Sequence, residues 1–184
     1  MNMFLIFITL IVFILLLIVI WYNSFVRRKA IIDEAWSGID VQLKRRYDLI
    51  PNLVSVVKGY AIHEKNVLEE VTRMRSAAMN ATQLQDKVTL EAGLTQALKT
   101  LFAVAEQYPN LKANENFLSL QKDLSFIEHE IQLARRYYNG ATREYNITIT
   151  KFPANIIATL FGFTKAPYFE LDVSRERDVP KINF

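Results

Sequence analysis

The longest regular pattern of apolar and polar positions in this chain runs from Asn114 to Phe152. Apolar residues recur there in alternating steps of three and four, and the only polar residue in the series is Thr148. Steps of this size place side chains on one stripe of an α-helix. Because so long a stripe needs neighbours along its whole length, it predicts a helical bundle or a coiled coil. The stripe consists of Phe117, Leu120, Leu124, Ile127, Ile131, Ala134, Tyr138, Ala141 and Tyr145.

The chain begins with a different pattern, an unbroken apolar run from Met3 to Ile20 in which Thr9 is the most polar residue. As a helix this run would be about 27 Å long, close to the thickness of the hydrocarbon core of a bilayer. An aromatic pair and a basic cluster follow it, as is typical of the edge of a membrane span. We expect residues 1–22 to form a transmembrane anchor. The anchor and its interface comprise Phe4, Leu10, Ile20, Trp21, Tyr22, Arg27, Arg28 and Lys29.

A cleaved signal peptide is the alternative for this run, and the sequence does not favour it. No basic residue precedes the apolar run, the run is too long, and no small-x-small cleavage site follows it. With the basic cluster on the cytoplasmic side, the positive-inside rule predicts that the N-terminus is outside the cell and that residues from Asn23 onward are cytoplasmic.

Helical periodicity continues from Phe25 to Tyr47 and is interrupted at Pro51. Proline has no backbone N–H and disfavours helical geometry at the preceding residue. In the first turn of a new helix the missing donor costs little, and Asp48 is a suitable N-cap. The sequence therefore predicts a turn at residues 48–51 and a second helix from about Leu49 to Met79. A single helix kinked at Pro51 is the alternative.

The next segments predict a polar loop over residues 80–86 and a third helix from Val88 to Tyr108, which Pro109 ends. With the long apolar stripe as the fourth helix, we expect an all-α fold. An N-terminal single transmembrane helix is followed by an antiparallel four-helix bundle, which occupies residues 23–152 and is cytoplasmic.

Residues 153–184 have a different composition, an apolar segment followed by a charged tail from Ser174 onward. Pro153 stops the long helix, and a short apolar helix ending near Gly162 is expected. If the chain turns at Pro51, an even number of helical passes returns this segment to the membrane. If the helix continues through Pro51, the segment is expected at the far tip of the bundle. The candidate membrane-contacting residues are Ile156, Ile157, Leu160, Phe161 and Phe163.

Nothing in the sequence indicates catalysis, a cofactor or a metal site. The two histidines, His63 and His129, are not preceded by glutamate in a Glu-x-x-His pattern, and His129 falls opposite the apolar stripe. The five glycines are isolated, no Gly-Lys-Ser/Thr sequence is present, and there is no cysteine. A net charge of +3 with interleaved signs gives no basic face for nucleic acid.

Polar residues gather near Pro51 and beside the stripe of the last long helix. One interpretation is a polar recognition strip for a partner. The other, which the pattern favours, is structural: amides at the flanks of a bundle bond to neighbouring helices and fix their register. The candidate strip consists of Arg45, Arg46, Asp48, Asn52, Arg135, Arg136, Asn139, Arg143 and Asn146.

The chain contains several distinctive short runs, at residues 35–36, 40–46, 48–53, 57–61, 134–139, 145–146 and 152–153. Together these runs resemble the LemA family of bacterial membrane proteins. The resemblance implies one N-terminal membrane helix and a cytoplasmic bundle of antiparallel helices. It implies no enzyme activity. It also implies a partner among envelope proteins, since family genes often lie near membrane proteases.

Together these observations predict a non-enzymatic, single-pass protein of the cell membrane that acts as a scaffold or adaptor for envelope proteins. The alternative is a self-assembling protein that organises or remodels the membrane. The expected partners are the lipid bilayer, an envelope or membrane protein and further copies of the chain, with no nucleic acid.

Overall fold

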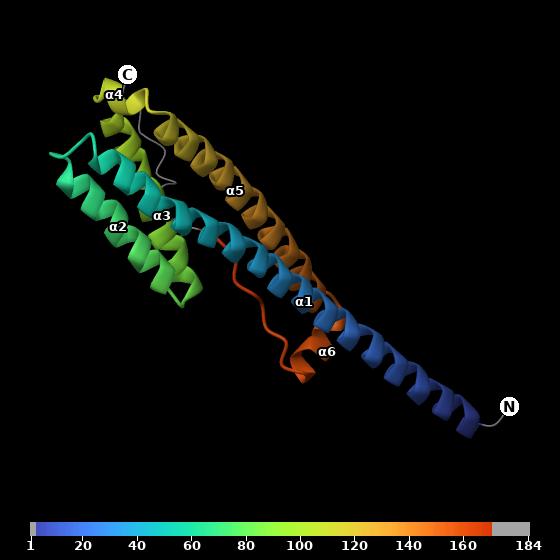
Figure 1. Cartoon of the computed structure of the whole chain (residues 1–184). Coiled ribbons are helices and arrows are strands. Elements are labelled where there is room, and N and C mark those ends of the chain that lie inside the picture. The colour runs from blue at the N-terminus through green and yellow to red at the C-terminus, as the bar shows by residue number, and fades with distance from the viewer. Residues whose placement is uncertain (1–2, 171–184) are drawn as a thin grey trace, which may run out of the picture. The chain divides into compact units, whose positions relative to one another are not determined.

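A single helix, α1 (Met3–Lys58), begins in the apolar run and continues without a break far beyond it (Figure 1). The computed structural model describes residues 3–170, and within that range all regular secondary structure is helical. The all-α prediction and the long N-terminal apolar helix are thus confirmed. The charged tail expected from Ser174 onward lies outside the described residues. The other helices are α2 (Lys65–Asn80), α3 (Leu84–Ala105), α4 (Pro109–Lys112), α5 (Glu115–Thr150) and α6 (Ala154–Leu160).

The chain forms two compact units, and α1 and α5 each contribute to both. The first, which we call the anchor unit, comprises residues 3–39 and 134–168. Its buried side chains come from α1, α5 and α6, and Trp36 packs edge-on against Tyr138 with ring centroids 5.8 Å apart. The principal buried residues are Phe25, Ile32, Ile39, Tyr138, Tyr145, Ile149, Ala154 and Ala158.

The apolar run at the start of α1 stays outside this core. Most of its side chains are exposed, and its most apolar window has no buried residue. Within residues 3–170, α1 is the one helix that is long and apolar enough to cross a membrane.

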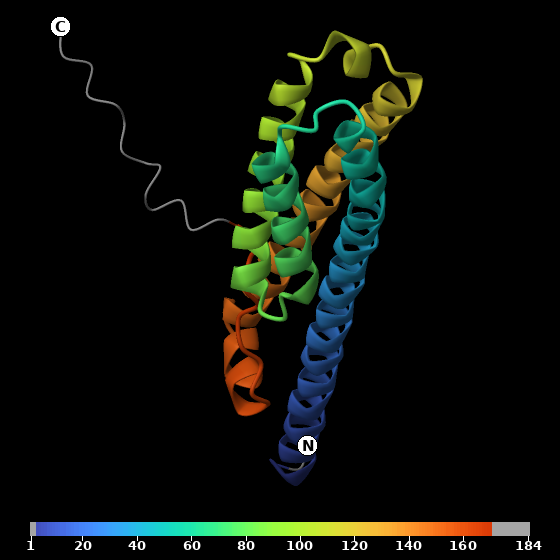
Figure 2. The same cartoon turned by 60° about the vertical axis from the view of Figure 1, so that its left-hand side comes forward.

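The second unit, which we call the cleft unit, comprises residues 40–133 and 169–170 of the described chain. Helices α2 and α3 are joined by the short loop 81–83 and pack against each other as a helical hairpin (Figure 2). The remainder of α1 and the first part of α5 contribute the other long helices of this unit. Its most deeply buried apolar residues include Leu43, Leu53, Val71, Leu94, Leu101 and Ile131.

The turn predicted at Pro51 is wrong, because α1 continues through this proline to Lys58. In a regular helix the N–H of residue 51 would donate to the carbonyl oxygen of Tyr47, and proline leaves that oxygen without its usual donor. The guanidinium of Arg75 on α2 replaces it, with Nε donating to the Tyr47 carbonyl oxygen at 2.7 Å. A side chain distant in sequence therefore makes the proline tolerable inside the helix.

The chain turns instead at residues 59–64, so the second helix begins at Lys65 rather than near Leu49. Two side-chain hydrogen bonds join this turn to the connection between α3 and α5. The hydroxyl of Tyr108 donates to Glu64 at 2.9 Å, and the amide of Asn114 donates to the hydroxyl of Tyr60 at 3.0 Å. Asn114 also caps α5, since its side-chain oxygen accepts the N–H of Phe117 at 3.0 Å.

The long amphipathic helix was predicted closely. Helix α5 begins at Glu115 and ends at Thr150, within two residues of the expected bounds. Every stripe residue from Phe117 to Tyr145 is buried or half-buried, whereas Phe152 is exposed. The short helix expected before Gly162 is α6, and Gly162 follows it with a φ of +73°, the left-handed conformation that glycine adopts readily at a helix end.

Candidate functional site

The cleft unit contains a buried cluster of charged side chains centred on Arg46 of α1. Its Nη1 lies 3.2 Å from Glu91 of α3 and 3.2 Å from Glu128 of α5, and its Nη2 donates to Thr95 at 2.8 Å. The hydroxyl of Tyr47 donates a short hydrogen bond to the other carboxylate oxygen of Glu91. Arg46 and Glu91 are almost entirely shielded from solvent. One guanidinium thus links α1, α3 and α5.

The electrostatics of the cluster follow from its burial. A buried charge is costly unless it is paired and hydrogen-bonded, and both carboxylate oxygens of Glu91 have partners. Burial, and secondarily the hydrogen bond to Glu91, raise the pKa of the Tyr47 hydroxyl well above its ordinary value. Tyr47 therefore stays protonated, and the stability that depends on this neutral phenol is lost only when the pH rises above the ordinary tyrosine range.

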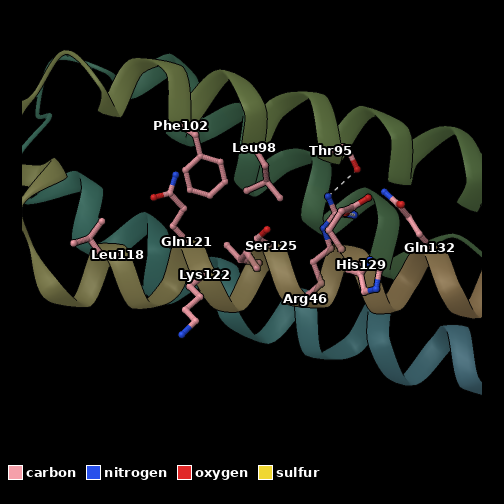
Figure 3. A pocket seen from close by; sticks show the side chains of 12 residues that line it. Arg46, Thr95, Leu98, Phe102, Leu118, Gln121, Lys122, Ser125, His129 and Gln132 are labelled. Atoms are coloured by element: carbon pink, nitrogen blue, oxygen red, sulfur yellow. Dashed lines mark hydrogen bonds and ion pairs between the residues drawn. The ribbon is translucent and has the colours of Figure 1, made fainter.

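An open cleft of about 610 Å³ leads to this cluster. Leu98 and Phe102 of α3 face Gln121 and Ser125 of α5 across it, and Arg46 lies between Ser125 and Gln132, as Figure 3 shows. The cleft therefore offers a mixed lining, in which apolar side chains alternate with polar and charged ones. A lining of this kind suits an amphipathic protein segment.

The candidate polar strip is divided between the two units. Arg46 is buried in the cluster, while Arg45, Asp48 and Asn52 on the same helix are exposed. The five strip residues of α5 belong to the anchor unit: Arg135 and Asn139 are half-buried, Arg136 and Arg143 are exposed, and Asn146 is buried.

Asn146 has a defined structural partner. Its side-chain oxygen accepts the N–H of Ala166 at 2.9 Å, and its amide nitrogen donates to the carbonyl oxygen of Ala166 at 2.9 Å. The hydroxyls of Tyr145 and Tyr138 donate to the carbonyl oxygens of Thr164 and Pro167, each at 3.0 Å. One face of α5 thereby holds residues 164–167 in place.

Replacing Asn146 with alanine is expected to loosen this segment. The variant loses both hydrogen bonds to Ala166, which together contribute about 1–2 kcal/mol. The amide of Ala166 should then exchange with solvent deuterium about tenfold faster or more. Hydrogen exchange by mass spectrometry measures this, with the exposed Asn155→Ala as the control. Unchanged exchange at residues 164–167 in Asn146→Ala would contradict the assignment.

The candidate membrane-contacting residues lie next to the end of the anchor. The ring of Tyr22 is 5.1 Å from that of Phe161 and 5.6 Å from that of Phe163, and Phe163 is 5.2 Å from Phe25. The helix is continuous through Pro51, yet the segment is beside Tyr22 rather than at a far tip, because the turn comes at residues 59–64 instead. Ile156 and Leu160 are exposed on α6, while Ile157 is buried.

Both histidines are exposed, as expected for His129. Within residues 3–170, no group of three or more histidine, aspartate or glutamate side chains could hold a metal ion.

Sequence reasoning missed Glu91, Thr95 and Glu128, which complete the Arg46 cluster. Glu91 occupies a position on the buried face of α3 between Val88 and Leu94. The only feature of the sequence that indicated a buried charge was a glutamate within a series of apolar residues. Its role depends on Arg46, which comes from another helix.

The sequence matches one protein-family model and is similar to several known proteins. The model of the LemA family matches residues 35–184. Magnetosome protein MamQ 2 of Paramagnetospirillum magneticum is 28% identical over 175 residues, covering 81% of this chain and 64% of its own length. Protein LemA of Metamycoplasma hominis is 28% identical over 158 residues, covering 85% of this chain and 72% of its own. The chain thus spans less than two thirds of the length of the MamQ protein.

Proposed function

The chain belongs to the LemA family, and on this premise we propose that it is a non-enzymatic, single-pass membrane protein that acts as a scaffold or adaptor for other envelope proteins. Family membership, the relatives and the apolar helix point to a membrane-associated protein. We propose the adaptor role, the orientation of the chain in the membrane and its partners.

The observation that carries this proposal is the continuity of α1. The same helix that exposes apolar side chains over residues 3–20 contributes Arg46 and Tyr47 to the buried cluster of the cleft unit. A protein built in this way carries its proposed anchor and part of its charged cluster on one continuous helix. We further propose that α2, α3, α5 and the part of α1 beyond the anchor pack as an antiparallel four-helix bundle, which the short connections support.

The cleft is the proposed docking surface. Its mixed lining of apolar and charged side chains matches an amphipathic segment of a partner, and Leu118 at its rim is exposed. A photo-crosslinking amino acid at Leu118, in the full-length protein in cells, should form an adduct with another envelope protein, to be identified by mass spectrometry. The same probe at Met79, exposed at the end of α2, should not. Adducts at Met79 but not at Leu118 would refute this docking surface.

The orientation of the chain in the membrane can be tested independently of the adaptor role. Arg27, Arg28 and Lys29 follow the anchor, so we propose that the N-terminus is outside and that the helices beyond the anchor are in the cytoplasm. Protease added to intact cells should then leave residues 30–170 uncut, and the same protease should digest them once the membrane is permeabilised. Digestion in sealed cells would reverse the topology.

The alternative function, self-assembly, is favoured by a second observation. Phe126 and Leu133 are exposed on α5 within the cleft unit, seven residues apart. Their spacing places them within a narrow stripe of the helix, opposite to its buried face. Such a stripe supports pairing between copies of the chain.

If the stripe pairs copies of the chain, the mass of the protein in detergent should be a multiple of 21.3 kDa once bound detergent is subtracted. Replacing both Phe126 and Leu133 with glutamate should reduce it to that of one chain, because carboxylates cannot be buried unpaired in an apolar interface. Light scattering after size-exclusion chromatography measures the mass, and Lys122→Glu on the same helix is the control. A wild-type protein with the mass of one chain would exclude assembly through this stripe.

A further inference from the structure

The C-terminal segment of the anchor unit carries unusually exposed apolar side chains. Phe152 is 81% exposed and Leu160 is 71% exposed, and Ile156 and Phe161 are exposed as well. Helix α6 directs Ala154, Ile157 and Ala158 into the unit, so its two faces differ. Large apolar side chains gathered on one surface of a protein indicate a contact that removes them from water.

The position of this segment identifies the contact. Phe161 and Phe163 pack edge-on against Tyr22, which directly follows the apolar run and Trp21. Tryptophan and tyrosine at the end of a membrane span lie at the level of the lipid headgroups. Side chains that touch Tyr22 are therefore at the surface of the same bilayer that the anchor enters.

The charges around the segment indicate the kind of lipid. Lys151 and Lys165 flank α6 and are exposed, and Arg27, Arg28 and Lys29 follow the anchor. Within residues 3–170, none of these five cations takes part in an ion pair. Residues 1–29 and 151–168 contain no aspartate or glutamate. Basic residues without local carboxylates attract anionic headgroups.

We propose that residues 151–165 form a second, interfacial membrane contact beside the anchor, selective for bilayers that contain anionic phospholipids. Ile156, Leu160 and Phe161 enter the boundary between headgroups and acyl chains, and Lys151 and Lys165 contact the phosphates. This inference rests on the proposed membrane anchoring but not on the adaptor role. It gives the protein two attachments to one leaflet, of which only the second depends on lipid charge.

The experiment uses the full chain reconstituted in nanodiscs, where the anchor is inserted in every variant. Because the chain has no cysteine, Leu160→Cys gives a single site for an environment-sensitive fluorophore. A quencher attached near the headgroup of the lipids should quench the fluorophore at residue 160 in discs of phosphatidylcholine mixed with phosphatidylglycerol. The same fluorophore at Ile62→Cys, exposed in the turn before α2, is the control and should not be quenched.

A second set of variants, in which the two lysines lose their charge, tests the selectivity for anionic lipid. In the Leu160→Cys background, Lys151→Gln with Lys165→Gln should shift the equilibrium away from the lipid contact by roughly 30-fold in anionic discs, since each basic residue contributes about fivefold there. Added salt should have the same effect in the parent. Quenching at residue 160 no greater than at residue 62 would overturn the membrane contact. Equal quenching with and without phosphatidylglycerol would overturn the selectivity. Failure of the chain to remain in the discs would instead refute the anchoring itself.

Discussion

Replacing Arg46 with alanine is expected to lower the free energy of unfolding by about 3–5 kcal/mol. The substitution leaves Glu91 fully buried with no cation to compensate its charge, and it removes the partner of Glu128. Removing one member of a buried ion pair is costly mainly because the other charge stays buried. Arg46 also links α1 to α3 and α5, so the loss should affect the cleft as well.

Chemical denaturation of the full-length protein in detergent, followed by circular dichroism, measures this effect. The neighbouring Arg45→Ala is a matched control, because Arg45 is exposed and has no ion pair among the described residues. Its effect should be within about 0.5 kcal/mol. Adding Glu91→Gln to an Arg46→Met variant should recover much of the loss, since glutamine keeps an acceptor for Tyr47 without a charge. Equal effects of Arg45→Ala and Arg46→Ala would show that the cluster is not buried as described.

Replacing Tyr138 with alanine is expected to destabilise the anchor unit by about 3–5 kcal/mol. The ring is buried against Trp36, and its hydroxyl donates to Pro167 at 3.0 Å. Alanine removes the ring contact, the hydrogen bond and the packing volume together. Tyr138→Phe removes only the hydrogen bond and should cost about 1 kcal/mol.

Thermal unfolding of the same protein preparation separates these contributions. His129→Ala is the control, because His129 is exposed on the same helix. A small effect of Tyr138→Ala, similar to that of His129→Ala, would mean that α5 presents a different face to its neighbours. A large effect of Tyr138→Phe would assign most of the stabilisation to the bond with Pro167.

The elements that sequence patterns predicted best are those whose signal is repeated along the chain. The bounds of α5 follow from a long apolar stripe, and the apolar run of α1 follows from its length and composition. The turn predicted at Pro51 is wrong because the rule that proline interrupts a helix considers only neighbouring residues. Proline cannot donate a hydrogen bond to the carbonyl oxygen of Tyr47, and Arg75 of α2 donates one instead. A residue so distant in sequence cannot be identified from the local pattern.

The residues of the candidate site were also hard to predict, because their contacts join helices that are distant in sequence. Arg45 and Arg46 are adjacent and chemically alike, and only the helical phase relative to Leu43 and Tyr47 separates an exposed arginine from a buried one. Glu91 shows its role only when α1 and α3 are brought together. Asn146 was recognised as a polar residue beside the stripe, but its partner, the backbone of Ala166, belongs to a segment without regular structure and hence without a periodic signal.

The unbroken course of α1 also makes this helix depend on its neighbour within the cleft unit. The carbonyl oxygen of Tyr47 accepts its hydrogen bond from Arg75 of α2, in place of the N–H that Pro51 lacks. Undocking of α2 would remove this bond from the residue next to Arg46, and α1 would then bend at the proline. The regular course of α1 past Pro51 is thus a property that α1 and α2 have only together.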